Sequence, residues 1–342
     1  MTLLTVVHSS DETRIESSFL SVSFLGLVST TLYSCGTRMY IKGRRSYLTE
    51  VQHTPVMAVE VLEGLKISSN GRYIDCTVGD GGHAKEVLGA STPAPRLLGI
   101  DLDEEALRVA SSRLGGSNRV VLCRSNFTGL AEVASSRGFS PADGVLFDLG
   151  VSSRILENPL RGFSFSNSGP LDMRFDQEQP LTANDIVNHV NESELANVIY
   201  EFGEDRMSRR IARAIVSRRP LQTTGQLATV VRSALGSKPT WGIHPATRTF
   251  QAIRIAVNRE IDNIRSGLES AIRILRPGGR LVVISYHSIE DRLVKRKFLA
   301  ESSISETAEI KLVNRKVIKP SREEVLLNPR SRSAKMRVVE RI

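Results

Sequence analysis

The segment "IDCTVGDGGHAKEV" (residues 74–87) decides the fold, because an apolar run is followed there by a glycine-rich turn and then by a helix-like run. Glycines between a strand and a helix let backbone N–H groups approach a ligand closely. Gly79, Gly81 and Ala84 match the spacing G-x-G-x-x-G/A, and Asp101 lies 22 residues after Gly79, where a carboxylate can bind ribose hydroxyls. The segment alone is compatible with a nicotinamide dinucleotide site, and also with a glycine turn that binds nothing.

Two further aspartates shift the prediction toward S-adenosylmethionine. Asp75 lies in the predicted strand, four residues before Gly79, where a carboxylate can hold the cationic methionine end of that cofactor but would repel a diphosphate. Asp148 ends an apolar run, and ligands of open α/β sheets bind outside the carboxyl ends of the strands. We therefore expect Asp75, Asp101 and Asp148 to converge on one crevice. The alternative is that one or two of them only cap helices or turns.

Strand-like and helix-like runs alternate from His53 to about residue 150. Continuous apolar runs are typical of parallel strands buried on both faces, and strand–helix repeats predict a doubly wound α/β domain. The predicted strands are 72–78, 96–101, 119–123 and 144–150, and the predicted helices are 82–89, 103–114 and 128–137.

The pattern changes near residue 156. Residues 156–181 are predicted to be a loop, 182–275 helices without strands, and 279–286 a further strand after a turn at 276–279. A helical insert within an α/β sheet explains this order. The predicted domains are therefore an α/β domain of residues 48–155 plus 256–342, and an insert domain of residues 156–255 that recognises RNA.

Residues 1–47 differ from the rest, since they are rich in Ser and Thr and end in a basic stretch. The apolar part is too short and too polar to span a bilayer, so we expect no membrane association. A disordered extension, an organelle-targeting segment and a start codon assigned too far upstream all remain open; Asp11, Glu12 and Glu16 argue against a transit peptide. The expected location is the cytoplasm, with a mitochondrion or plastid as the alternative.

Positive charge is concentrated at the C-terminal end of the chain. Residues 292–342 contain 14 Lys and Arg against 6 Asp and Glu, a net charge of +8 out of +9 for the whole chain. Such a segment favours an acidic partner, most often nucleic acid. The three cysteines have no metal-ligand spacing, so neither a disulfide framework nor a metal site is expected.

Eight stretches, in the same order along the chain, resemble the MraW/RsmH family of ribosomal RNA small subunit (cytosine-N4)-methyltransferases. The resemblance covers roughly residues 50–342, and eight motifs in order make it specific where one would be weak. The stretches are HTPVM (53–57), DCTVGDGGH (75–83), FDLGVSS (147–153), RGFSF (161–165), GPLDMRFD (169–176), IHPATRTFQAIRIAVN (243–258), VVISYHSIEDR (282–292) and NPRSRSAKMR (328–337).

The resemblance implies a class I, Rossmann-like methyltransferase fold with an inserted all-helical domain. It implies S-adenosylmethionine as methyl donor and, as acceptor, a cytidine in the decoding region of small-subunit ribosomal RNA, either naked or in the assembled subunit. The family's cofactor contacts map onto Gly81, Gly82, His83, Asp101, Phe127 and Asp148. The strand and loop pattern described above adds Gly79 and Asp75 to the expected cofactor site. From its position after the third predicted strand, Phe127 is expected either on the adenine ring or in the core.

One position departs from the family pattern. Where the family usually has a Gln that contacts the cofactor, this chain has Ile155, which cannot donate or accept a side-chain hydrogen bond. The contact is then lost, or replaced by Ser153 or Arg154. A lost neutral hydrogen bond is worth about 1 kcal/mol, so weaker binding is expected rather than inactivity.

Cytosine N4 is a poor nucleophile, because its lone pair is delocalised into the ring. The main task of such an enzyme is to align N4 with the methyl carbon and its leaving group, and a hydrogen-bond acceptor near N4 would localise the lone pair. Asp148 is the predicted acceptor. Tyr286 or His287 is expected to stack on the target base or bond it, with helix capping or packing as the alternative for His287.

The segment 205–219 is predicted to be a two-faced helix that contacts RNA phosphates. Arginines share one face and apolar residues the other, and a second group of candidate RNA contacts follows it. The residues are Arg206, Arg209, Arg210 and Arg213 on one face; Met207, Ile211 and Ile215 on the other; and His244 and Arg248 in the second group. Pairing with carboxylates inside the fold is the alternative for these cations.

Two other functions compete with an RNA methyltransferase. One is a non-catalytic RNA-binding ribosome assembly factor with a relic cofactor pocket, and the other is a nicotinamide-dependent oxidoreductase. The sequence leaves the oligomeric state open, with a homodimer as one alternative.

Overall fold

The computed structural model describes residues 19–22, 30–35, 38–42, 55–236, 244–302 and 308–342, and the chain divides into the units Met1–His53 and Thr54–Ile342. In the first unit, β1 (Phe19–Val22), β2 (Thr30–Cys35) and β3 (Arg38–Lys42) form an antiparallel sheet in the order β1-β2-β3. The other residues of the predicted extension 1–47 lie outside the described residues, so its role stays a prediction. No helix among the described residues is both long and apolar enough to cross a bilayer.

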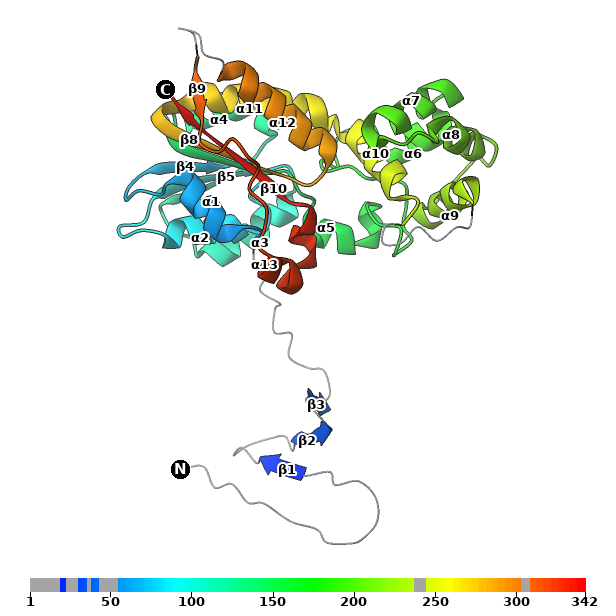
Figure 1. The fold of residues 1–342 in the computed structure, drawn as a ribbon, viewed down its shortest axis with the longest axis horizontal. Helices are drawn as coiled ribbons and strands as arrows, with labels where there is room; N and C mark the ends of the chain where they lie inside the picture. The colour runs from blue at the N-terminus through cyan, green and yellow to red at the C-terminus, as the bar shows by residue number, and fades with distance from the viewer. Residues whose placement is uncertain (1–18, 23–29, 36–37, 43–54, 237–243, 303–307) are drawn as a thin grey trace. The chain divides into compact units, whose positions relative to one another are not determined.

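A seven-stranded sheet in the order β6-β5-β4-β7-β8-β10-β9 forms the centre of the second unit (Figure 1). Five of its strands are parallel, whereas β10 runs antiparallel to both β8 and β9. The strands are β4 (Arg72–Asp75), β5 (Arg96–Asp101), β6 (Val120–Arg124), β7 (Ala142–Asp148), β8 (Leu275–Ser285), β9 (Ile310–Leu312) and β10 (Lys335–Arg341). The predicted α/β class is confirmed.

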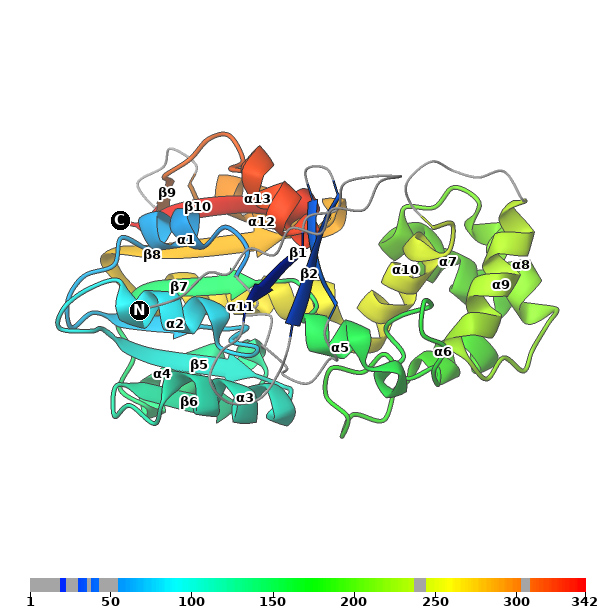
Figure 2. The ribbon, with the colours of Figure 1, turned by 90° about the horizontal axis from the view of Figure 1, so that it is seen from below.

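Helices cover both faces of this sheet, which explains the continuous apolar runs in the sequence. Leu97 of β5 packs into the core on one face, whereas its neighbour Leu98 packs into the core on the other. On the first face lie α1 (Ala58–Leu65), α2 (Gly82–Gly89) and α3 (Glu104–Leu114); on the second lie α4 (Leu130–Ser136), α11 (Glu260–Ile274) and α12 (Ser288–Glu301) (Figure 2).

Two sequence predictions about strand boundaries are wrong. The strand predicted at 72–78 ends at Asp75, because the glycine loop begins there. The turn predicted at 276–279 lies within β8. There the register with β7 jumps from the pair Ala142–Leu275 to the pair Gly144–Arg280, and Gly278 has a φ of 76°. The Pro-Gly signal therefore marks an irregular segment inside a strand, not a separate turn before it.

A helical bundle with its own apolar core follows the loop after β7. The helices are α6 (Ala183–His189), α7 (Glu192–Gly203), α8 (Ser208–Val216), α9 (Thr224–Leu235) and α10 (Thr247–Asn258). Leu195, Ile199, Ile211, Ile215 and Ile253 belong to its core cluster. Because residues 54–342 form one compact unit, the insert boundaries at 156 and 255 stay a prediction.

The helix predicted from residue 205 begins three residues later, at Ser208. The carboxylate of Asp205 accepts a hydrogen bond from the backbone N–H of Met207 at 2.9 Å, as Asp side chains do in turns. The Met207 side chain therefore precedes the helix and is exposed, whereas Ile211 and Ile215 are fully buried. The prediction that Met207 belongs to the apolar face is wrong.

Two buried polar side chains fix the loop between the sheet and the bundle, which also contains α5 (Ser153–Glu157). Asn258 donates from Nδ2 to the carbonyl of Met173 at 2.7 Å and accepts from the backbone N–H of Phe175 at 2.8 Å. Arg161 donates to the carbonyls of Arg174 and Phe175, both at 3.0 Å. The loop predicted at 156–181 is thus tied to α10, next to the carboxyl edge of the sheet.

Candidate active site

The glycine loop joins Asp75, the last residue of β4, to Gly82, the first residue of α2. Gly79 and Gly81 have φ values of 50° and 81°, a backbone conformation that glycine adopts without a steric penalty. A Cβ atom added to Gly81 would lie 3.3 Å from Cα of Ala110. The loop therefore needs glycine for its conformation and for close packing, and it leaves the first N–H groups of α2 available to a ligand.

The structure brings Asp75, Asp101 and Asp148 to the carboxyl edge of three adjacent parallel strands. Asp75 is buried, and burial raises its pKa to about 6; His83 and the Thr77 backbone N–H lower that pKa, while Asp148 and Asp101 raise it. The three carboxylates therefore interact electrostatically within one site.

Asp101 also has the capping role that the sequence left open. Its Oδ2 accepts from the backbone N–H of Gly79, and its Oδ1 from that of Asp103, both at 2.9 Å. These bonds link the glycine loop to the loop after β5. Because each carboxylate oxygen has two acceptor sites, Asp101 can support the loop and still accept bonds from ribose hydroxyls.

Asp148 is held by two neighbours, one from the loop after β4 and one from the residue after β8. The Tyr286 hydroxyl, just after β8, donates to Asp148 Oδ1 at 2.8 Å. The backbone N–H of Asp148 donates to the Thr77 hydroxyl at 2.7 Å. These contacts leave Oδ2 of Asp148 facing Nε2 of His83 at 3.6 Å, which is an ion-pair distance and too long for a hydrogen bond.

His83 is buried, with no hydrogen bond to either ring nitrogen among the described residues. Burial by itself opposes the charged ring, but Asp148, then Asp75 and Glu86, outweigh it and raise the pKa of His83 above its usual value. A protonated His83 would place a positive charge beside the Asp148 carboxylate at this edge.

The buried polar groups of this site fit a cationic ligand. Oδ2 of Asp75 has no hydrogen-bond partner among the described residues, although it is buried. Such a group is costly unless a partner is supplied, and an ammonium group would supply donors and positive charge. A site with several carboxylates repels a diphosphate, so the residues present fit S-adenosylmethionine and not a dinucleotide.

Phe127 packs against the core beneath the site. Its ring lies edge-to-face with Phe147, with centroids 5.3 Å apart, and a Cβ added to Gly267 would lie 2.7 Å from its Cδ2 atom. Phe127 is only half-buried. The core contact is present, and the contact with adenine stays a prediction.

Arg154, next to the family's missing Gln, joins the two loops that line the site. Its guanidinium lies 3.1 Å from Asp80 in the glycine loop, 3.3 Å from Asp103 after β5 and 3.0 Å from Glu105 at the start of α3. Ile155 is buried. Arg154 therefore stabilises these loops through ion pairs with their carboxylates.

The predicted RNA contacts fall into two groups. Arg206, Arg210 and Arg213 are exposed on or next to α8, with Arg213 3.5 Å from Glu192. In both views α8 lies at the end of the bundle away from the sheet (Figures 1 and 2). The structure does not bring these arginines to Asp148, and their contact with RNA stays a prediction.

The second group of predicted RNA contacts is already engaged within the protein. His244 stacks on Phe165 with centroids 4.4 Å apart, and Arg248 donates to the carbonyl of Glu204 at 3.2 Å. His287 caps α12: its Nδ1 accepts from the Glu290 N–H at 3.4 Å, and its Nε2 lies 2.9 Å from Oε1 of Glu290. A bond from His287 to a base would have to replace one of these contacts.

Glu260, His287 and Glu290 have potential metal ligand atoms within 4.8 Å of one another. The guanidinium of Arg254 already bonds both oxygens of Glu260 at 2.8 Å and lies 3.9 Å from Glu290. The Arg254 guanidinium therefore supplies the positive charge next to these carboxylates. This cluster is an ion-pair network between α10, α11 and α12.

Sequence reasoning missed the contacts that orient the site. Tyr286 was one of two candidates for contact with the target base, and its bond to Asp148 was not predicted. Thr77, Asp103 and Arg161 were not singled out, although Arg161 is buried and lies 3.3 Å from Asp103. The only signal in the sequence was that Thr77 lies in the motif DCTVGDGGH and Arg161 in the motif RGFSF; Asp103 lies in none of the eight stretches.

The parallel sheet with its antiparallel β10, the glycine loop and the acidic strand ends together define a class I methyltransferase fold. The model of the MraW methylase family matches residues 50–342, and the chain belongs to that family.

Two relatives illustrate this membership. The ribosomal RNA small subunit methyltransferase H of Dehalococcoides mccartyi is 47% identical over 308 residues, covering 86% of this chain and 88% of the relative. The protein of the same name from Symbiobacterium thermophilum is 48% identical over 307 residues, covering 85% and 96%. A solved structure, a putative rRNA-methylase from Clostridium thermocellum, aligns with a TM-score of 0.40 at 10% identity, covering 83% of this chain and 94% of that one.

Proposed function

We propose that this protein methylates N4 of a cytidine in the decoding region of small-subunit ribosomal RNA, with S-adenosylmethionine as donor. The observation that carries the proposal is the oriented carboxylate of Asp148 at the same sheet edge as the glycine loop and the buried Oδ2 of Asp75, which has no hydrogen-bond partner among the described residues. The names of the curated relatives support ribosomal RNA as the substrate class.

S-adenosylmethionine would supply a methyl group on a sulfonium, which is already a strong electrophile. Asp75 would hold the ammonium end, and the N–H groups around Gly81 and Gly82 would contact the carboxylate. Asp101 would bind the ribose hydroxyls, and Phe127 would lie against adenine. The pKa of about 6 for Asp75 leaves it mostly ionised at neutral pH, and a bound cation would lower that pKa further.

Asp148 would act on the acceptor base. With Oδ1 held by Tyr286, Oδ2 can accept a hydrogen bond from the N4 amino group and so localise the nitrogen lone pair. Transfer of the methyl group to N4, with cleavage of its bond to the donor sulfur and release of a thioether, would make the nitrogen acidic, and Asp148 would take its proton. The His83 ring, 3.6 Å away, would stabilise the carboxylate before this transfer.

The arginines of α8 would hold RNA at a distance from the target base. They are exposed, and exposed guanidinium groups bind phosphates independently of sequence. Freeing a base from a structured RNA costs a few kcal/mol, and backbone contacts of this kind would offset that cost. We place the activity where bacterial-type ribosomes are assembled: the cytoplasm, or a mitochondrion or plastid.

Calorimetric titration with S-adenosylmethionine, followed by methyl transfer from labelled donor to small-subunit RNA, tests the proposal. We expect saturable cofactor binding and label in RNA. RNA binding without cofactor binding would instead identify an assembly factor with a relic pocket, and NADH binding would identify an oxidoreductase. Naked RNA and assembled subunits should be compared, since each is a candidate substrate.

A further inference from the structure

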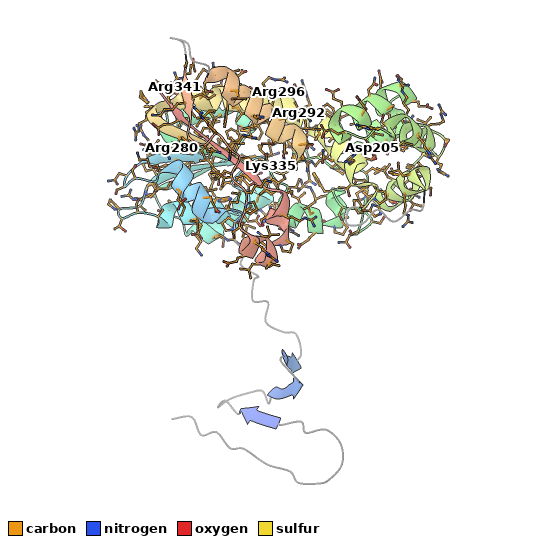
Figure 3. All side chains as sticks on the ribbon, in the orientation of Figure 1. Asp205, Arg280, Arg292, Arg296, Lys335 and Arg341 are labelled. Atoms are coloured by element: carbon orange, nitrogen blue, oxygen red, sulfur yellow. The ribbon has the colours of Figure 1, made fainter. Side chains whose placement is uncertain are left out.

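A basic surface begins at the same sheet edge as Asp148 and continues along α12, β9 and β10. The register pairs Lys335, the first residue of β10, with Ser285, which precedes Tyr286. Helix α12 starts three residues after Ser285. We call this region the α12 surface; its cations are Arg292, Lys295, Arg296, Arg315, Lys316, Lys335 and Arg337. Figure 3 labels Arg292 and Arg296 on α12 and Lys335 on β10.

Few carboxylates neutralise the α12 surface. Lys335 and Arg337 share one carboxylate, Asp291, at 3.4 and 2.7 Å, and Arg292 pairs with Glu204. Lys295, Arg296, Arg315 and Lys316 are exposed and form no ion pair within the part of the chain that the structure describes. Because no carboxylate among the described residues pairs with these four cations, they form either a solvated basic face or a site for an anionic partner.

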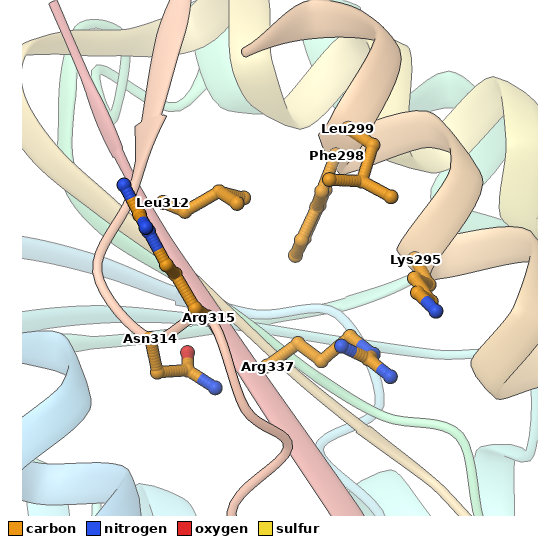
Figure 4. A pocket seen from close by; sticks show the side chains of 7 residues that line it. All are labelled: Lys295, Phe298, Leu299, Leu312, Asn314, Arg315 and Arg337. Carbon is orange, nitrogen blue, oxygen red and sulfur yellow. The ribbon is translucent and has the colours of Figure 1, made fainter.

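A small hollow lies within this surface (Figure 4). Lys295 of α12, Arg315 after β9 and Arg337 of β10 surround a floor that includes Phe298 and Leu312. Its volume is about 30 Å³, far below the roughly 300 to 1,000 Å³ of small-molecule pockets. The hollow is therefore too small for a nucleobase, and the surface suits the phosphate backbone instead of reading bases.

We propose that the α12 surface binds the phosphate backbone of the ribosomal RNA that flanks the target nucleotide. This inference rests on the proposed function, since it assumes that RNA enters the site at Asp148. The cations continue from the sheet edge itself, so a strand with one base at Asp148 would meet them directly. The α8 arginines, by contrast, lie at the far end of the bundle (Figure 2).

The test is the salt dependence of RNA binding by the full chain. Each phosphate contact contributes about 0.7 to 0.9 to the slope of log K against log salt. The double substitution Lys295→Glu and Arg315→Glu should lower the slope by about 1.4 to 1.8. The matched control is Arg108→Glu with Arg137→Glu, two exposed arginines on α3 and after α4 without ion pairs among the described residues. Both pairs change the net charge equally, so a general charge effect would appear in both.

Three outcomes are distinguishable. The inference holds if only the α12-surface variant loses slope and shows at least a tenfold higher KM for RNA, with cofactor affinity unchanged. It fails if the two variants bind RNA alike. If the charge reversals do not fold, Lys295→Gln with Arg315→Gln should show the same loss of slope, and the inference is overturned if it does not. Absence of any methyl transfer by the wild-type protein would instead contradict the proposed function.

Discussion

Tyr286 and Asp148, 138 residues apart in the sequence, are joined by a hydrogen bond of 2.8 Å from the phenol to Oδ1 of the carboxylate. The two residues lie at the ends of the neighbouring parallel strands β7 and β8. The bond fixes which oxygen of Asp148 is available to a substrate. In the proposed mechanism Tyr286 is a positioning residue, and the deprotonated phenol is disfavoured because burial and Asp148 both raise its pKa.

Replacing Tyr286 with Phe should lower kcat while leaving cofactor affinity nearly unchanged. A hydrogen bond to a charged group contributes about 1.5 to 3 kcal/mol, so we expect a loss of about 10- to 100-fold. Single-turnover methylation measures this directly. Tyr200→Phe, at an exposed tyrosine on α7, is the control; a normal rate in Tyr286→Phe would show that the bond does not orient the reaction.

Replacing Asp75 with Asn should abolish tight cofactor binding and remove its pH dependence. Because the pKa of Asp75 is raised to about 6, the wild-type affinity should fall about tenfold for each pH unit below 6 and level off above it. His83, Asp148 and Asp101 also act on the Asp75 carboxylate, so the measured pH dependence of cofactor affinity reports the four groups together. Calorimetry from pH 5 to 8 tests this, and a flat wild-type profile would contradict it.

The same substitution should stabilise the folded chain at neutral pH. The folded state holds the Asp75 proton more tightly than the unfolded state, so this contribution to stability is fully present below about pH 4 and is lost as pH rises through 6. A shift of about two pKa units corresponds to up to about 3 kcal/mol. Denaturant unfolding without cofactor should therefore show Asp75→Asn more stable than wild type at pH 8. Equal stability there would mean that the carboxylate is solvated.

Replacing Arg154 with Ala should weaken cofactor binding through the loops. Arg154 bridges Asp80, Asp103 and Glu105 and is partly exposed, so its ion pairs are discounted for solvent. We expect about a tenfold higher Kd with little change in kcat at saturation. Ile155→Gln is the informative comparison: tighter binding by about 1 kcal/mol would mean that the family's amide contact was truly lost. If Arg154→Ala binds normally, the bridging role is wrong.

Replacing Arg206, Arg210 and Arg213 with Ala should weaken RNA binding without affecting chemistry. Loss of two or three phosphate contacts should lower the salt slope by about 1.4 to 2.7. The rate at saturating RNA should stay normal, because α8 is remote from the sheet (Figures 1 and 2). Arg108→Ala with Arg137→Ala is the control. An unchanged salt slope in the triple variant would mean that the α8 arginines form only a solvated face.

The sequence predicted the layers of the fold well, because local patterns determine them. Apolar runs marked β4, β5, β6 and β7, and the glycine positions marked the loop before α2. It failed at 276–279, where Pro and Gly indicated a turn but the chain stays in β8 with a register jump. Local composition cannot show that a neighbouring strand will pair with such a segment.

The site was predicted only in part, because long-range packing decides the rest. Strand-end positions were enough to expect three carboxylates at one edge. The bond from Tyr286 to Asp148 depends on the pairing of β7 with β8, and the bridge made by Arg154 depends on two loops that meet in space. For His287 the structure shows the helix cap that the sequence kept open as the alternative, and a contact with the target base stays a prediction.

The most direct measurement is mass spectrometry of nucleosides from small-subunit RNA incubated with S-adenosylmethionine and the purified protein. The account predicts N4-methylcytidine at one decoding-region position with wild type, and at least a 100-fold lower rate with Asp148→Asn, whose cofactor affinity should be tested in parallel. Methylation at another atom, or normal turnover by Asp148→Asn, would contradict the role assigned to this carboxylate.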